Sequence, residues 1–157
     1  MEREAFSRQV TAMRGSLYRV AAGYLRGESD RLDAVSEAIA RAWERRGSLR
    51  DERLFKTWIT RILMRECVNI QRRQRRCVPV ETVPEAAGDD EDSAEALRRA
   101  LDKLPQRWRT MVVLHYMEGY DVREIAAIMR TTKGAVCAGL SRARERLRSL
   151  IGEEYDE

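Results

Sequence analysis

Arginine is the most informative residue type in this chain, because its number and spacing predict a surface that binds anions. The segment from Lys133 to Leu150 carries an arginine at every second position from Arg142 to Arg148. A guanidinium group stays charged and binds phosphate oxygens through paired hydrogen bonds. The apolar residues of this segment recur at spacings of four and three, on one face of a helix: Val136, Leu140, Ala143, Leu147 and Leu150. We predict a helix with one buried face and a basic surface that can sit on a polyanion.

A shorter helix is predicted just before this basic helix. Asp121 is placed to cap the N-terminus of residues 122–129, and Glu124 follows three residues later, as in a capping box. Thr131 and Thr132 then supply the turn. A short helix, a tight turn and a longer basic helix form a helix-turn-helix unit, whose second helix enters the DNA major groove through its N-terminal residues.

Residues suited to catalysis or metal binding are sparse. The single histidine, His115, lies in a predicted helix next to apolar residues, and no Ser/His/Asp or Cys/His set can be assembled around it. Cys67, Cys77 and Cys137 lack the spacing of a zinc site or a disulfide framework, so we interpret them as reduced thiols. The sequence therefore predicts no enzyme, no catalytic residue, no metal and no cofactor.

Charge is strongly segregated along the chain. The 30 basic and 26 acidic residues give a net charge of +4, yet residues 81–96 hold seven acidic and no basic side chains. This acidic stretch also contains Pro84 and Gly88, which disfavour regular structure. We therefore predict an all-α protein of two small helical domains, residues 1–77 and 95–152, joined by a flexible acidic linker, residues 78–94.

The first domain is predicted to contain three amphipathic helices, over residues 3–26, from Ser29 or Asp30 to Gly47, and from Asp51 to Arg76. The buried stripe expected for the second helix is Leu32, Val35, Ile39, Ala42 and Trp43. No apolar run approaches the ~20 residues that span a bilayer, and the N-terminus lacks the apolar region of a signal peptide. We expect a cytoplasmic protein without membrane contact of its own.

Two segments resemble the sigma-70 family of RNA polymerase sigma factors. The stretch DRLDAVSEAIARAW from Asp30, followed by FKTWITRI from Phe55 and the basic run to Arg76, resembles region two of that family. The stretch LPQRWRTMVVLHYMEGYDVREIAAIM from Leu104, continuing into GAVCAGLSRARERL from Gly134, resembles region four. Regions one and three have no counterpart, as in the extracytoplasmic-function (ECF) group.

The resemblance implies a transcription initiation factor that binds core RNA polymerase and directs it to promoter DNA, with an anti-sigma factor as regulator and no small-molecule substrate. Core polymerase would dock on the second helix through Asp30, Asp33, Glu37 and Arg41. The downstream promoter element would be opened and held by Arg50, Arg53, Trp58, Arg61, Arg65, Arg72, Arg73 and Arg76. The upstream element would be read in the major groove from Thr131, Thr132, Lys133, Ala135, Cys137, Arg142 and Arg144.

The predicted recognition helix departs from the family pattern. Where relatives often carry a polar and basic trio, this chain has Cys137, Ala138 and Gly139. These side chains offer little for hydrogen bonds to base edges. We therefore expect upstream recognition to rest mainly on phosphate contacts and DNA shape.

Two other functions are compatible with the residues alone. A stand-alone helix-turn-helix regulator would bind duplex DNA without polymerase, and this alternative predicts a dimer on a palindromic site. A protein that only sequesters another factor could use the same helical faces, although such an interface does not require two basic blocks.

Overall fold

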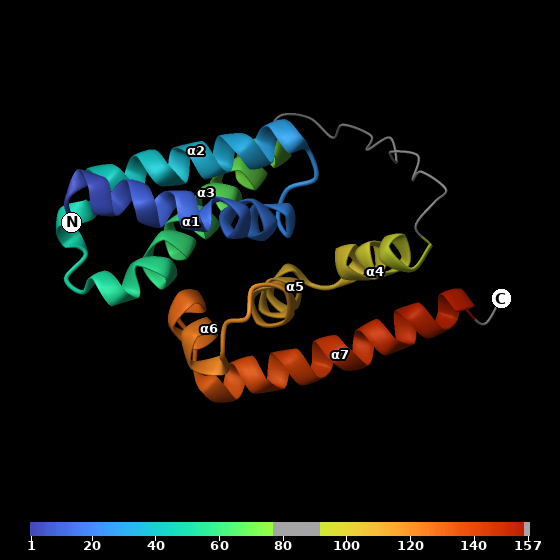
Figure 1. The fold of residues 1–157 in the computed structure, drawn as a ribbon. Coiled ribbons are helices and arrows are strands. Elements are labelled where there is room, and N and C mark those ends of the chain that lie inside the picture. Colours follow the sequence, from blue (N-terminus) through green and yellow to red (C-terminus); the bar gives the residue numbers. More distant parts are fainter. Residues whose placement is uncertain (77–91, 156–157) are drawn as a thin grey trace.

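The computed structural model describes residues 1–76 and 92–155, and within these ranges every regular element is helical, as predicted (Figure 1). The α-helices are α1 Arg3–Ala22, α2 Glu28–Glu44, α3 Phe55–Arg76, α4 Asp92–Lys103, α5 Gln106–Val112, α6 Val122–Met129 and α7 Lys133–Tyr155. The 3-10 turns η1 Arg46–Ser48 and η2 Glu52–Leu54 join α2 to α3, and the π-helical turn η3 Val113–Met117 extends α5.

The predicted linker only partly coincides with the described residues. Residues 77–91, on which the predicted flexibility falls, lie outside them. Helix α4 begins at Asp92, so the last residues of the predicted linker, 92–94, are helical.

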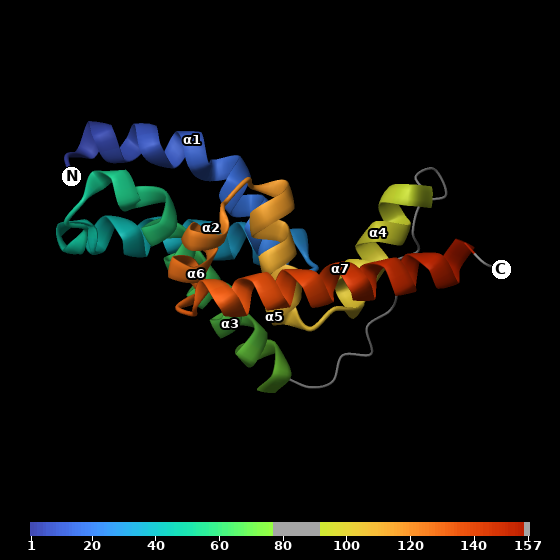
Figure 2. The ribbon, with the colours of Figure 1, turned by 90° about the horizontal axis from the view of Figure 1, so that it is seen from below.

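Helices α1, α2 and α3 form one group, in which α1 and α2 lie side by side and α3 crosses them (Figures 1 and 2). Ala34, Ala38 and Ala42 recur every four residues along α2 and are fully buried. Their small side chains allow close helix approach and centre the buried stripe of α2. The prediction that Leu32 belongs to this stripe is wrong, because the alanine row turns Leu32 outward and leaves it 51% exposed.

The ends of the predicted helices shift by a few residues in this group. Helix α1 ends at Ala22 rather than near residue 26. Helix α3 begins at Phe55 rather than at Asp51, because the Asp51 carboxylate accepts a hydrogen bond of 3.0 Å from the backbone N–H of Arg53 and caps the turn η2 instead.

An aromatic cluster lies where the start of α1, the end of α2 and the start of α3 meet. The ring of Phe6 lies edge-on to Trp43 and to Phe55, at centroid distances of 5.2 and 5.8 Å. Trp58 lies 5.9 Å from Phe55 and is half-buried against the core. The guanidinium of Arg46 stacks 3.7 Å from the centroid of Trp43. The predicted packing role of Trp43 is thereby confirmed.

In the second group, α4, α5 and α6 all pack along the long helix α7 (Figure 1). The predicted capping box is confirmed: Asp121 accepts from the backbone N–H of Glu124 at 2.8 Å, and the Glu124 carboxylate accepts from the backbone N–H of Asp121 at 3.1 Å. The chain then turns at Arg130, which adopts a left-handed conformation with φ of 53°. The tight turn therefore begins one residue before the two threonines predicted to form it.

Gly139 allows α7 to pack closely on α5. A methyl group added at Gly139 would collide with the sulfur of Met111, a side chain that is itself 1% exposed. The interpretation of Gly139 as a base-reading position is therefore wrong. The residue faces the protein interior, and its missing side chain is needed there.

The two helical groups share one continuous apolar core. Helix α6 lies on α3, and η3 lies on the end of α1. Polar side chains also join the groups: Arg19 pairs with Glu118 at 2.6 Å, Tyr24 with Thr110 at 2.9 Å, and Thr60 with Tyr120 at 3.2 Å. We call this contact the interdomain seam.

The contact of Gly139 with Met111 predicts an asymmetric response to alanine in α7. Gly139→Ala should lower the free energy of unfolding by about 1–3 kcal/mol, because the added methyl overpacks the α5–α7 contact. Gly134→Ala is the matched control, since its new methyl would meet only Thr132, at 3.9 Å. That variant should be neutral or up to about 1 kcal/mol more stable from helix propensity. Urea unfolding measures both, and equal effects would contradict the close approach.

Tyr24 should make the protein sensitive to alkaline pH. Burial raises the pKa of its hydroxyl to about 12, whereas a tyrosine in an unfolded chain ionises near pH 10. The folded state disfavours the anion, so this contribution to stability is complete below about pH 10 and is lost as the pH rises toward 12.

In Tyr24→Phe this loss is absent. The free energy of unfolding of the wild type, relative to Tyr24→Phe, should therefore fall by about 2–3 kcal/mol from pH 10 to 12. Urea unfolding at each pH tests this, and parallel curves for wild type and Tyr24→Phe would contradict it.

Candidate nucleic-acid interface

Helix α7 presents most of the residues predicted to contact the upstream element. Its cations Lys133, Arg142 and Arg144 are exposed, and so is Cys137, whereas Ala135 is half-buried. Arg142 and Arg144 are two positions apart and so lie on different sides of the helix. Their exposure suits cations that contact phosphates on either side of a groove.

The two threonines of the turn are engaged within the protein. The Thr132 hydroxyl accepts a hydrogen bond of 3.1 Å from the backbone N–H of Ala135 and so caps the N-terminus of α7. The Thr131 hydroxyl accepts from Arg107 at 3.1 Å. Both side chains therefore shape the start of the helix, in addition to any contact with DNA.

Three residues beside α7 were missed by the sequence analysis. Arg107 lies on α5 and reaches Thr131. Arg130 is exposed in the turn. Tyr116, from η3, accepts a hydrogen bond of 2.8 Å from Arg144 and so holds that guanidinium in place. No helical period links Arg107 and Tyr116 to α7, because tertiary packing brings them there, whereas Arg130 lies in the turn that leads into α7.

Helix α3 carries a second set of cations. Arg65, Arg72 and Arg73 are exposed, and the side chain of Arg76 lies outside the described residues. Arg61 is half-buried, and its pKa is lowered by burial and by the nearby charges of Arg130 and Arg65. The cations of α3 and those of the helix-turn-helix turn therefore approach each other at the interdomain seam.

The segment before α3 contributes less free charge than predicted. Arg50 is exposed. Arg53 pairs with Asp51 at 3.1 Å, and this pairing holds the pKa of the Asp51 carboxyl below its usual value. Trp58, predicted to contact opened DNA, is half-buried against Phe55 and presents only part of its ring.

The outer face of α2 holds the residues predicted to bind polymerase. Asp33 and Glu37 are exposed. Asp30 accepts a hydrogen bond of 2.6 Å from Gln74 of α3. Arg41 lies 2.7 Å from the carboxylate of Glu66, which is 3% exposed, and 3.3 Å from Glu37. Arg41 thus neutralises a buried carboxylate, and Asp33 and Glu37 remain as the outward acidic groups.

A groove runs beside this acidic face. It has a volume of about 340 Å³ and is lined by Arg14, Tyr18, Leu32, Val35, Ser36 and Ile39. The exposed side chain of Leu32 forms part of its rim. The face thus combines an apolar groove with acidic side chains, a combination found in helix-binding surfaces.

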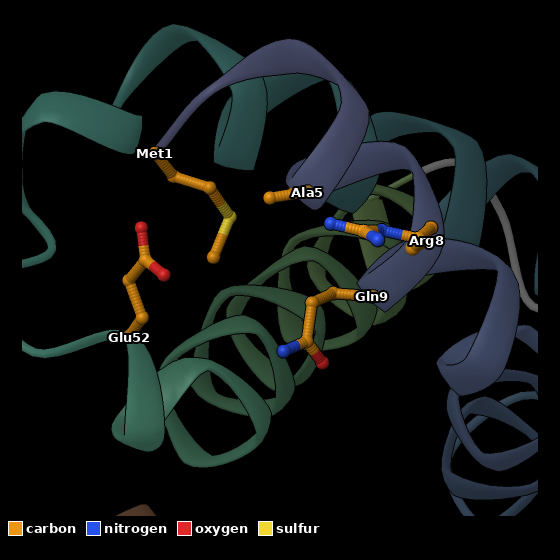
Figure 3. Close-up of a pocket in the computed structure, with 5 residues that line it drawn as sticks. All are labelled: Met1, Ala5, Arg8, Gln9 and Glu52. Carbon is orange, nitrogen blue, oxygen red and sulfur yellow. The ribbon is translucent and has the colours of Figure 1, made fainter.

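A second hollow, of about 320 Å³, lies between the start of α1 and the turn η2 (Figure 3). It is lined by Met1, Ala5, Arg8, Gln9 and Glu52. This set offers one carboxylate and no nucleophile, so it lacks the paired groups of an acid–base site.

His115 has a local partner, since its Nδ1 lies 2.9 Å from the backbone oxygen of Tyr120. Among residues 1–76 and 92–155, no cluster of three or more His, Cys, Asp or Glu side chains could hold a metal ion. In the same ranges, no helix has the length and apolar character to cross a membrane.

Both helical groups match the profiles of known protein families. The profile of sigma-70 region 2 matches residues 9–77, and the profile of sigma-70 region 4 matches residues 94–147. The first match covers α1 to α3, and the second covers α4 to most of α7. Together they account for most of the chain.

Individual relatives agree with this assignment. The chain is 30% identical to RNA polymerase sigma factor SigV of Bacillus subtilis over 92% of this chain and 90% of SigV. It is 31% identical to ECF RNA polymerase sigma factor SigM of Mycobacterium tuberculosis over 96% of this chain and 79% of SigM.

The fold has a close counterpart among solved structures. The sigma factor RpoE of Bartonella quintana, in complex with the anti-sigma factor NepR, superimposes with a TM-score of 0.80 at 23% identity, over 94% of this chain and 96% of RpoE. Both family profiles match in order, and SigM, a relative of the extracytoplasmic-function group, is 31% identical over 96% of this chain. This chain therefore belongs to the sigma-70 family of RNA polymerase sigma factors, in its extracytoplasmic-function group.

Proposed function

We infer that this chain is a transcription initiation factor that binds core RNA polymerase and directs it to promoter DNA. The observation that carries this inference is the presence, in one chain of the sigma-70 family, of an exposed acidic face on α2 and of exposed cations on α3 and α7. The acidic face of α2 suits a protein partner, and the cations of α3 and α7 suit the DNA backbone. Since polymerase acts in the cytoplasm, we expect this chain to act there, without catalytic activity of its own.

In this proposal the outer face of α2 is the polymerase contact. Asp33 and Glu37 supply exposed negative charge, and the neighbouring groove supplies apolar area. Asp30 and Arg41 act mainly through structure, because their partners Gln74 and Glu66 tie α2 to α3. Core polymerase would therefore present basic and apolar side chains to α2.

Promoter DNA would contact both basic helices. Arg50, Arg65, Arg72 and Arg73 are the exposed cations best placed to follow the opened downstream strand. On α7, Lys133, Arg142 and Arg144 would contact phosphates beside the upstream major groove, and Ala135 and Cys137 would face base edges without forming paired hydrogen bonds. Arg107 and Arg130 extend this cationic surface to α5 and to the turn.

An anti-sigma factor is the expected regulator. The solved relative RpoE was captured with such a protein. By binding the α2 face or the cations of α7, an inhibitor of this kind would exclude polymerase or DNA.

Sedimentation separates this function from that of a stand-alone regulator. We expect the pure chain to sediment as a monomer and to shift into a large complex when core polymerase is added. A stable dimer that binds a palindromic duplex equally well with and without polymerase would favour the regulator instead.

Charge reversal on α2 should weaken polymerase binding without unfolding the chain. In the double variant Asp33→Lys/Glu37→Lys we expect at least a tenfold loss of affinity for core polymerase, because both exposed acidic groups become repulsive to a basic partner. The chain should stay folded, since the exposed pair of Glu37 with Arg41 that the variant removes contributes only about 0.3–0.5 kcal/mol.

The matched control for this pair is Glu2→Lys/Glu4→Lys at the start of α1. Both glutamates are exposed, and the variant changes net charge by the same amount. It should bind polymerase like the wild type in a fluorescence titration. If both double variants lose affinity equally, net charge rather than the α2 face governs binding.

Upstream binding should depend on cations more than on base sequence. Lys133→Ala and Arg142→Ala should weaken binding by similar factors on different upstream sequences, and each should lower the slope of log affinity against log salt by about one. Arg148→Ala is the control, because this exposed arginine lies about 9 Å farther along α7 from Arg142. Holoenzyme binding to a panel of promoters, at several salt concentrations, measures these effects. A loss confined to one sequence in Arg142→Ala would indicate direct base readout instead.

A further inference from the structure

The turn between α6 and α7 holds an arginine where the backbone favours glycine (Figure 1). Arg130 has φ of 53° and ψ of 51°, and in residues 1–76 and 92–155 it is the one non-glycine residue with a positive φ. The backbone N–H of Thr131 donates to the carbonyl of Ala126 at 2.9 Å. This helix-ending hydrogen bond fixes the left-handed conformation, in which a Cβ atom crowds the following carbonyl oxygen. Arg130 therefore strains the free chain.

Nothing in the described part of the chain compensates this strain. The side chain of Arg130 is exposed, and no hydrogen bond or ion pair joins its guanidinium to another residue of the ranges 1–76 and 92–155. Its charge lies near Arg61 of α3, whose pKa is lowered by burial and, to a smaller degree, by Arg130 and Arg65. Like charges repel. The backbone and the nearby charge thus both disfavour arginine at this position.

Position 130 lies where the helix-turn-helix unit would meet DNA. The turn leads into the N-terminus of α7, the end that such a second helix directs into a major groove. Lys133 is exposed in the first turn of α7, and Arg107 of α5 donates to the hydroxyl of Thr131 at 3.1 Å. Three cations therefore gather at the turn, and a phosphate of the DNA backbone is the anion that this place in the fold would meet.

Helix α7 has few side chains of its own that could hold DNA near its start. Cys137 and Ala138 are exposed but short, and Gly139 faces Met111. The next of its proposed DNA-contacting cations after Lys133 is Arg142, about 14 Å farther along the helix axis. A long cationic side chain in the turn would add a contact at the end of α7 where the helix itself offers least.

We propose that Arg130 anchors a backbone phosphate of promoter DNA, and that it occupies the left-handed turn at the expense of the stability of the free chain. This inference deepens the proposed function and rests on it for the identity of the DNA. A phosphate contact carries no base-sequence information, so Arg130 would add affinity equally on different promoters. An acidic protein surface is the other anion that could bind an exposed arginine, and the experiment distinguishes the two.

Three substitutions at position 130 separate charge from backbone strain. Arg130→Gly removes both, Arg130→Ala removes the charge alone, and Arg130→Lys removes neither. The first two should each weaken holoenzyme binding to promoter DNA by roughly tenfold, because a hydrogen bond to a charged group is lost. Each should also lower the slope of log affinity against log salt by about 0.9. Arg130→Lys should keep the slope and lose less affinity, because an ammonium group replaces a guanidinium that can form paired hydrogen bonds.

Thermal unfolding of the free chain measures the strain. Arg130→Gly should melt about 2–4 °C above Arg130→Ala, because only glycine relieves the crowding of Cβ in the left-handed conformation. Arg130→Lys should melt close to the wild type. A variant that gains stability and loses promoter affinity would show a role in binding, since a residue with a structural role alone loses stability when it is replaced.

Two controls accompany these measurements. Arg148→Ala removes the same charge from an exposed position about 22 Å beyond Lys133 along α7, and it should bind promoter DNA like the wild type. Fluorescence titration with core polymerase in the absence of DNA should give the same affinity for Arg130→Ala as for the wild type.

Unchanged promoter affinity and salt slope in Arg130→Ala would overturn the phosphate contact. A loss of affinity for core polymerase alone would do the same and would indicate an acidic protein partner. If Arg130→Gly is no more stable than Arg130→Ala, the strain is refuted. The proposed function fails separately, when the wild-type chain does not bind core polymerase in sedimentation. In that case the same variants are compared as free chains on duplex DNA at low salt, because a phosphate contact needs no polymerase.

Discussion

Close approach of helices at small residues is the constraint on which the rest of this structure depends. Ala34, Ala38 and Ala42 let α2 sit against its neighbours, and Gly139 lets α7 sit against α5. A helix packed through a row of small side chains has little freedom to rotate, because a turn about its axis would drive larger residues into the contact. The outward directions of Asp33 and Glu37 on α2, and of Lys133 and Arg142 on α7, follow from these contacts.

Partners within the protein decide which arginines can serve DNA. Arg41, Arg46 and Arg53 are engaged by Glu66, Trp43 and Asp51, respectively. The contacts of Arg41 and Arg46 use a guanidinium for folding, whereas Arg53 is 90% exposed and is held only by a local pair. A basic composition therefore overstates the nucleic-acid surface, and the arginines that remain exposed on α3 and α7 define it better.

The sequence by itself determined the helical fold, the order of the two conserved regions and the local signals that start each helix. The capping box of Asp121 and Glu124 and the apolar stripe of α7 depend on near neighbours in the chain, so they could be predicted from spacing. Only the tertiary structure decided that Gly139 points inward, that Leu32 points outward and that Arg107 and Tyr116 lie beside α7. It also decided that Thr60 meets Tyr120, sixty residues away. Such contacts arise where distant helices pack, and the periodicity of a single helix carries no information about its neighbour.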